Sequence, residues 1–410
     1  MPPTPRVKIA GKATNWLRRH FRSVNSEGGV PHVERVTFSP RDPEERPRRG
    51  DSARYSVHPT GVPTMPENRL NFAVDINSSE LVVETVSEWL HHPASEVDRL
   101  MNSSRETVLR AIYLLNAKAS EGEQEASYYQ QLLLSRIYKI LTQLPTGPTA
   151  EGSVLIAEIT RRLEEHTIAA EDAAIPESLY DEAPTAPREY LSWLKSLAKE
   201  HRVYKHPYYV DFIRNDATAE DLRRYTIQES VVDGRFDDLL AMMQVGTTGA
   251  AKMEIAGNFW DEMGNGNDAE VHTHLFGKIY EVFDISEAEV EAEMTTLDLL
   301  SGNLAVLVSK YRHLYGEAVG LLGMTEWLVP DRFTNVVTGW ERLGLPDVGI
   351  TYHRLHITVD SRHAAGWFHN VVIPAVHDPA MRRSIARGAM WRLNSSARHL
   401  DERLARAVHA

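Results

Sequence analysis

Apolar residues recur at helical spacing along most of the chain, and this periodicity constrains the fold more than any other feature of the sequence. From about residue 67, runs such as SSELVVETVSEWLHH (78–92) and EASYYQQLLLSRIYKILTQL (125–144) place apolar residues three or four positions apart. The two-residue alternation that indicates strands is scarce. We therefore predict an all-α helical bundle, with Ser79 and Ser104 as N-caps of early helices.

Composition divides the chain into three parts. Residues 1–66 hold 12 of the 45 Lys and Arg residues, 6 of the 57 Asp and Glu residues, and 10 of the 21 prolines. A segment of this kind buries little apolar surface, so we expect a flexible, basic, proline-rich arm. After the breaks LPTGPTAEGS and AAIPESLYDEAPTAPRE, we expect a helical N-terminal region over 67–180 and a second helical domain over 187–410.

The chain has no cysteine, which excludes disulfides, thiolate metal sites and thiol nucleophiles. Any metal must be held by carboxylates and by some of the 18 histidines. The net charge of -12 disfavours bulk binding to nucleic acid or anionic membranes. No run is long and apolar enough for a membrane span or a secretory signal, so we expect a cytoplasmic protein.

The segment TYHRLHITVDSRHAAGW carries a stripe of groups that can bind metal. On an ideal helix His356, Asp360 and His363 fall within about 60° of one another. Three such groups on one face of a mostly apolar helix suit a ligand set, because unpaired buried polar groups are costly. Surface residues, or a buried histidine paired with the aspartate, are the plainer alternatives. His353 lies near the same face and is either a supporting group or an exposed one.

Further acidic and imidazole groups occur upstream. In NFWDEMGNGNDAEVHTHLF, the side chains of Glu262 and His272 can meet only if the helix between them unwinds, which Gly264 and Gly266 favour. A plain helix end with solvated acidic residues is the alternative. Glu326, among apolar neighbours in LLGMTEWLVP, is expected to be buried, and a buried carboxylate needs a cation or a proton.

These motifs resemble the haem-oxygenase-like diiron oxidases and oxygenases, often labelled iron-containing redox enzymes. The resemblance covers roughly residues 190–400 and is most specific in the Asp-Glu-x-Gly-x-Gly stretch with its later His-x-x-Leu-Phe, and in the closing His-x3-Asp-x2-His. In the third helix Glu317 competes with Glu326, and His274 does not match the family spacing. The resemblance implies these metal ligands: Glu229, Glu262, His272, Glu326, His356, Asp360 and His363.

The resemblance also implies a function. Two Fe(II) ions would activate O2 with electrons from an external donor and oxidise a small amino-acid-derived or amine substrate. N-oxygenation is favoured because Glu262 matches a carboxylate found in members that oxygenate amine nitrogens; C–H oxidation of an amino or fatty acid is the alternative. Haem is disfavoured because the first helix, TAEDLRRYTIQESVV, has no histidine. An iron-binding or metal-free interaction protein remains the hypothesis from another class.

Related multi-domain members use an N-terminal extension to pair two chains. By this resemblance we expect a homodimer formed through residues 67–180, with a small molecule as the only other partner.

Overall fold

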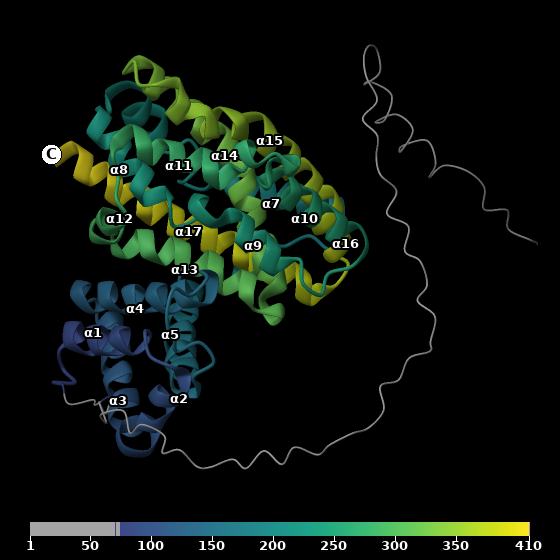
Figure 1. The fold of residues 1–410 in the computed structure, drawn as a ribbon. Helices are drawn as coiled ribbons and strands as arrows, with labels where there is room; N and C mark the ends of the chain where they lie inside the picture. Colours follow the sequence, from purple (N-terminus) through teal and green to yellow (C-terminus); the bar gives the residue numbers. More distant parts are fainter. Residues whose placement is uncertain (1–69, 71–73, 410) are drawn as a thin grey trace, which may run out of the picture. The chain divides into compact units, whose positions relative to one another are not determined.

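The computed structural model describes residue 70 and residues 74–409, and this part of the chain is helical, with no strand. The predicted all-α class is therefore confirmed (Figure 1). Contacts group residues 67–410 into one unit. The arm expected over residues 1–66 lies outside the described residues. None of the described helices is both long and apolar enough to cross a membrane.

The N-terminal helices form a small bundle in which α3 packs against α4 and α5, and α1 packs against α4. The cap of the first helix is Ser78, whose hydroxyl accepts a hydrogen bond from the amide of Leu81, so the prediction of Ser79 was one residue late. Ser104 lies inside α3, because a 3-10 turn over Asp98–Leu100 starts that helix earlier than expected. The helices are α1 (Ser79–Trp89), α2 (Ala94–Val97), α3 (Met101–Ser120), α4 (Gln124–Thr142), α5 (Val154–Ala173) and α6 (Ser178–Asp181).

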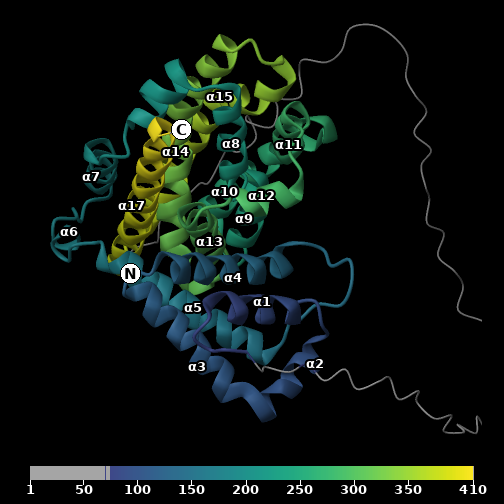
Figure 2. The ribbon, with the colours of Figure 1, turned by 90° about the vertical axis from the view of Figure 1, so that its left-hand side faces the viewer.

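In the second part of the chain, α14 packs against both α15 and α17. Figure 2 shows α14 and α17 side by side. The α-helices of this part are α7 (Pro187–Glu200), α8 (Ala219–Glu229), α9 (Phe236–Met243), α10 (Gly249–Glu262), α11 (His272–Phe283), α12 (Glu287–Glu293), α13 (Thr296–Lys310), α14 (Tyr315–Arg342), α15 (Thr351–Trp367), α16 (Ile373–Ala375) and α17 (Pro379–His409). Two π-helices lie at Tyr208–Asp216 and Phe368–Val372.

Glycines allow α14 and α17 to approach closely. A Cβ at Gly320 would lie 2.0 Å from the carbonyl oxygen of Ile385, and one at Gly388 would lie 2.0 Å from that of Glu317. Such distances are impossible for any larger residue unless the backbones separate. The close contact fixes α14, which carries part of the candidate site, against the longest helix of the described chain.

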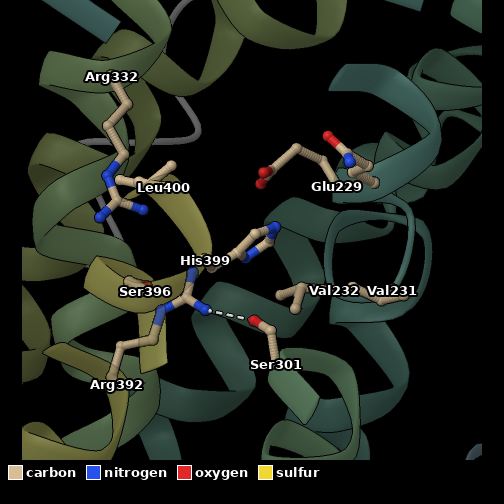
Figure 3. Close-up of a pocket in the computed structure, with 10 residues that line it drawn as sticks. Glu229, Val231, Val232, Ser301, Arg332, Arg392, Ser396, His399 and Leu400 are labelled. Atoms are coloured by element: carbon tan, nitrogen blue, oxygen red, sulfur yellow. Dashed lines mark hydrogen bonds between the residues drawn. The ribbon is translucent and has the colours of Figure 1, made fainter. Parts of the chain in front are cut away.

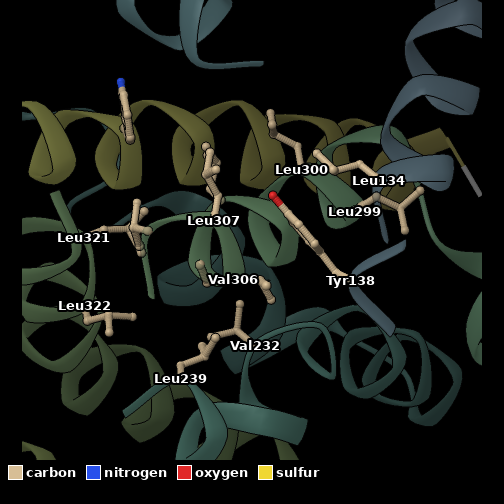
Figure 4. Close-up of a cluster of buried hydrophobic side chains, with 14 of the residues drawn as sticks. Leu134, Tyr138, Val232, Leu239, Leu299, Leu300, Val306, Leu307, Leu321 and Leu322 are labelled. Carbon is tan, nitrogen blue, oxygen red and sulfur yellow. The ribbon is translucent and has the colours of Figure 1, made fainter. Parts of the chain in front are cut away.

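The N-terminal helices also pack on the second part of the chain. Leu134 and Tyr138 of α4 meet Leu299 and Leu300 of α13 in one buried apolar cluster (Figure 4). The Asn303 side-chain amide donates to the Gln131 carbonyl at 2.9 Å. Residues 67–180 therefore share a core with the bundle that follows them.

Candidate metal centre

Two groups of buried acidic and imidazole side chains stand out among the described residues. The first consists of Glu262 on α10, His272 on α11 and His356 on α15. The second consists of Glu326 on α14 with Asp360 and His363 on α15. Within each group, one ligand atom per residue lies within 4.8 Å of the others. Six of the seven residues expected as metal ligands thus lie in these two groups of three.

Glu262 and His272 converge because the helix between them is interrupted. α10 ends at Glu262, two 3-10 turns follow, and α11 begins at His272, which leaves His272 Nδ1 only 2.8 Å from Glu262 Oε2. Gly264 adopts φ +59°, and a Cβ there would lie 2.6 Å from the Glu270 backbone. The unwinding that the sequence required is therefore present, and it depends on glycine at position 264.

The predicted stripe on α15 divides between the two groups. The Nε2 atom of His356 lies 3.9 Å from Glu262 Oε1, whereas His363 Nδ1 lies 3.5 Å from Glu326 Oε2 and 3.7 Å from Asp360 Oδ1. Side chains on one helical face thus reach two adjacent centres, which is the arrangement that a dinuclear site needs.

Hydrogen bonds orient the two imidazoles of α15. His356 donates from Nδ1 to the Tyr352 carbonyl at 2.8 Å, and His363 donates from Nε2 to Asp261 Oδ2 at 2.9 Å. Each bond orients the ring and turns its other nitrogen towards the carboxylates. Asp261 is therefore a supporting residue whose position next to Glu262 gave no sequence signal of this role.

One cavity joins the two groups. Its free space is about 20 Å³, room for about one water molecule, and it is lined by polar members of both groups. Its apolar walls come from α9, α14 and α15. The lining residues are Asp233, Phe236, Glu262, Thr325, Glu326, Val329, Phe333, Tyr352, His356 and Asp360.

Glu229, the carboxylate expected from the first helix, lies outside both groups. Glu229 is directed to the guanidinium of Arg403, which donates to its carboxylate, and Glu229 belongs to neither group. Asp233, one turn further along the chain, is buried and lines the cavity. It lies in a 3-10 turn after α8, where no helical periodicity could indicate its direction. Asp233 is thus a cavity-lining carboxylate that the sequence analysis did not single out.

Burial and mutual repulsion control the protonation of this site. Burial raises the pKa of Asp360, and the neighbouring carboxylates of Glu326, Glu262 and Asp233 raise it further. Burial would likewise raise the pKa of Glu262, but the imidazoles of His272 and His356 outweigh it and lower the pKa to about 2.

His363 shows the opposite balance. Burial opposes its charge, yet the carboxylates of Glu326 and Asp261 raise its pKa to about 9. Without a metal, the site therefore holds a proton on an imidazole that faces two carboxylates.

The other expected residues take supporting or separate positions. Glu317, the competitor of Glu326, accepts a hydrogen bond from Arg387 at 3.0 Å and is absent from both groups. His274 is exposed on α11. His353 is buried against Phe333 with its Nε2 atom 3.4 Å from the Tyr225 hydroxyl, and burial lowers its pKa to about 3.

The side chains fit two divalent metal ions. Two buried carboxylate oxygens in this region, Glu326 Oε1 and Asp233 Oδ2, have no hydrogen-bond partner among the described residues. Four buried carboxylates (Asp233, Glu262, Glu326 and Asp360) and three neutral imidazoles would be neutralised by two divalent cations. Oxygen and nitrogen ligands without sulfur are a set that iron accepts.

Comparison with known families agrees with this chemistry. Residues 223–397 match the family model described as iron-containing redox enzyme, a range that includes both groups of ligands. No curated protein matches the chain.

Metal binding is expected to release protons at neutral pH. His363 carries a proton below about pH 9 and must lose it to donate its lone pair, so raising the pH towards 9 should increase metal affinity by up to about tenfold per unit. Calorimetric titration with Mn²⁺ in buffers of different ionisation enthalpy measures the released protons. Proton release that is absent, or an affinity independent of pH between 7 and 9, would contradict this assignment.

Proposed function

We propose that the chain, whose residues 223–397 match the iron-containing redox enzyme family, is a non-haem diiron oxygenase acting on a small amine or amino-acid-derived substrate. The observation that supports two ions is the division of the buried acidic and imidazole side chains into two groups of three, each of which contributes two residues to the lining of one cavity. If only one metal ion were bound, the buried carboxylates of the other group would have no cation to balance their charge.

We propose that the ligands are the six clustered residues and Asp233. Glu262, His272 and His356 would hold one ion, and Glu326, Asp360 and His363 the other, with Asp233 at the cavity wall in the role first expected for Glu229. When bound, the iron pair supplies the electrons and open coordination positions that activate O2. An external donor must return those electrons.

The protein residues supply position and exclusion of water. Asp261 and the Tyr352 carbonyl hold the imidazoles of His363 and His356 in the orientation that ligation requires. Phe236, Val329 and Phe333 form apolar walls that limit water around the reacting atoms.

We propose N-oxygenation as the reaction because Glu262 adds a carboxylate to the site. In balanced form, an amine, O2, two electrons and two protons give a hydroxylamine and water. Substrate-dependent O2 uptake by the iron-loaded enzyme, followed by mass spectrometry, tests this. Oxygen retained on nitrogen supports the assignment, whereas oxygen on carbon or loss of two hydrogens would indicate C–H oxidation.

Iron binding separates the enzyme from an interaction protein. We expect the full chain to bind about two Fe(II) per chain under anaerobic conditions and the His356→Ala and His363→Ala variants each to lose at least one. The exposed His274 provides the matched control, and His274→Ala should bind as the wild type does. Iron analysis with circular dichroism checks binding and folding together; no uptake by the wild type would leave the interaction protein.

Asp233 and Glu229 can be distinguished by amide substitution. Asp233→Asn should weaken iron binding at least about tenfold, because it removes an anionic donor from the cavity. Glu229→Gln should leave the iron content unchanged and instead lower the melting temperature, because Arg403 loses a buried partner. The reverse pattern would restore Glu229 as the ligand.

We propose that two chains pair through residues 67–180. Several large apolar side chains of this region are exposed, among them Leu81, Tyr113 and Leu144. Because α4 shares a core with α13, deleting the region would expose that core, and point substitution is the sharper test. We expect light scattering to show a dimer for the wild type and a monomer for a Tyr113→Glu/Leu144→Glu variant; a wild-type monomer would refute the pairing, and a variant that stays dimeric would exclude this surface.

A further inference from the structure

A second cavity beside α14 is small, buried and lined by basic side chains. It lies between α8, α13, α14 and α17 (Figure 3), and its free space is about 10 Å³, room for about one water molecule. The side chains of Arg332, Arg392, His399 and two serines line it together with Glu229. None of the residues proposed as metal ligands takes part in this lining, so these side chains have no role in the proposed metal centre.

Arg332 of α14 brings a positive charge into this cavity without an acidic partner. Only 8% of the residue is exposed, and among the described residues its guanidinium takes part in no ion pair or hydrogen bond. Its Nη2 atom is buried and unpaired. The guanidinium lies over the Tyr209 ring, 5.4 Å from the centroid, and this contact leaves its charge without a counterion.

Arg392 of α17 lies at the same cavity and is only partly satisfied. It is 7% exposed and donates one hydrogen bond, from Nη1 to the Ser301 hydroxyl at 3.0 Å, while its Nε atom is buried and unpaired. Burial, and then the charge of Arg332, lower its pKa to about 10, so it remains charged at neutral pH. Two like charges therefore line a space with room for about one water molecule.

The acidic groups near this cavity are already paired with a third arginine. Arg403 donates to both Glu229 and Asp298, so the cluster contains three guanidinium charges and two carboxylate charges. His399 adds no charge at neutral pH, because burial and the neighbouring Arg403 lower its pKa. Asp233, the next carboxylate along the chain, lines the metal cavity instead. One monovalent anion would therefore make the cluster neutral.

The size of the cavity determines which anion fits. A carboxylate, nitrate or sulfate group has several heavy atoms and does not fit a space with room for one water molecule. A water molecule itself fits and accepts hydrogen bonds from the arginines, but it leaves the buried positive charge uncompensated. A chloride ion is a single atom only slightly larger than a water molecule, accepts several hydrogen bonds and brings the missing charge.

We propose that this cavity binds one chloride ion between Arg332 and Arg392, with the Ser301 and Ser396 hydroxyls beside it. The Ser301 hydroxyl accepts from Arg392, so its own hydrogen can be donated to the ion. Because the cavity lies between α13, α14 and α17, the ion connects the helix that carries Glu326 to its two neighbours. This inference is independent of the proposed function, since it needs neither iron nor substrate.

The test compares chloride with larger anions on the full chain. Protein purified in chloride is exchanged into sodium methanesulfonate, an anion too large for the cavity, and ion chromatography of the denatured protein counts the chloride that it retains. The melting temperature is then measured as chloride replaces methanesulfonate at constant ionic strength. We expect either about one retained chloride per chain or a saturable rise of about 5 °C at roughly 100 times the dissociation constant.

Two results would overturn the chloride site. One is a protein that retains no chloride and whose melting temperature does not respond to it. The other is an equal saturable rise with nitrate or acetate, because these anions do not fit the cavity and would have to act elsewhere.

Substitution connects the chloride effect to the cavity. Arg332→Met should abolish both chloride retention and the chloride-dependent rise, yet it should melt no lower than the chloride-free wild type, because an uncompensated buried charge has been removed. An arginine with a purely structural role would give the opposite result, a lower melting temperature with the chloride effect unchanged. The exposed Arg161→Gln is the matched control and should behave as the wild type does.

Long-wavelength diffraction detects the ion directly and needs no variant. Wild-type crystals grown in chloride should show an anomalous difference peak between Arg332 and Arg392, comparable in height to the peaks of the methionine sulfurs. Density at this position without an anomalous peak would be a water molecule and would contradict the proposal. Iron content of the same protein is a separate readout: the chloride site stands if no iron binds, and iron binding stands if the chloride site fails.

Discussion

Four carboxylates buried around one cavity are the constraint on which the rest of this structure depends. Asp233, Glu262, Glu326 and Asp360 are each at least nine-tenths buried, and burial penalises their charge unless cations or protons compensate it. In the absence of metal, the site compensates in part, with a raised pKa on Asp360 and a proton on His363. Two divalent ions would complete this compensation with the ligand atoms already oriented.

The fold holds such an unfavourable site in place through close backbone contacts. Gly320 and Gly388 let α14 lie directly on α17, so the helix that carries Glu326 has little freedom to relax. The left-handed turn at Gly264 directs α11 back towards α10 and brings His272 to Glu262. The close helix contacts and the turn at Gly264 hold the site rigid, whereas its acidic side chains add buried charge that destabilises the fold.

Negative and positive cavities lie next to each other in this bundle. The metal cavity gathers carboxylates, whereas the neighbouring one gathers Arg332 and Arg392 without enough acidic partners. Glu229 lies on the positive side, where Arg403 donates to its carboxylate.

Helical periodicity in the sequence determined the all-α fold, and local spacing determined the stripe of His356 and His363 on one helical face, because both depend on residues a few positions apart. The glycine-rich break before His272 was equally local. Tertiary structure alone decided that this stripe is divided between two groups, that Glu326 and not Glu317 faces the cavity, and that Asp233 lines the cavity while Glu229 faces Arg403. Those outcomes depend on which distant arginine pairs with each carboxylate, and the pairing of groups far apart in the chain leaves no periodic signal in the sequence.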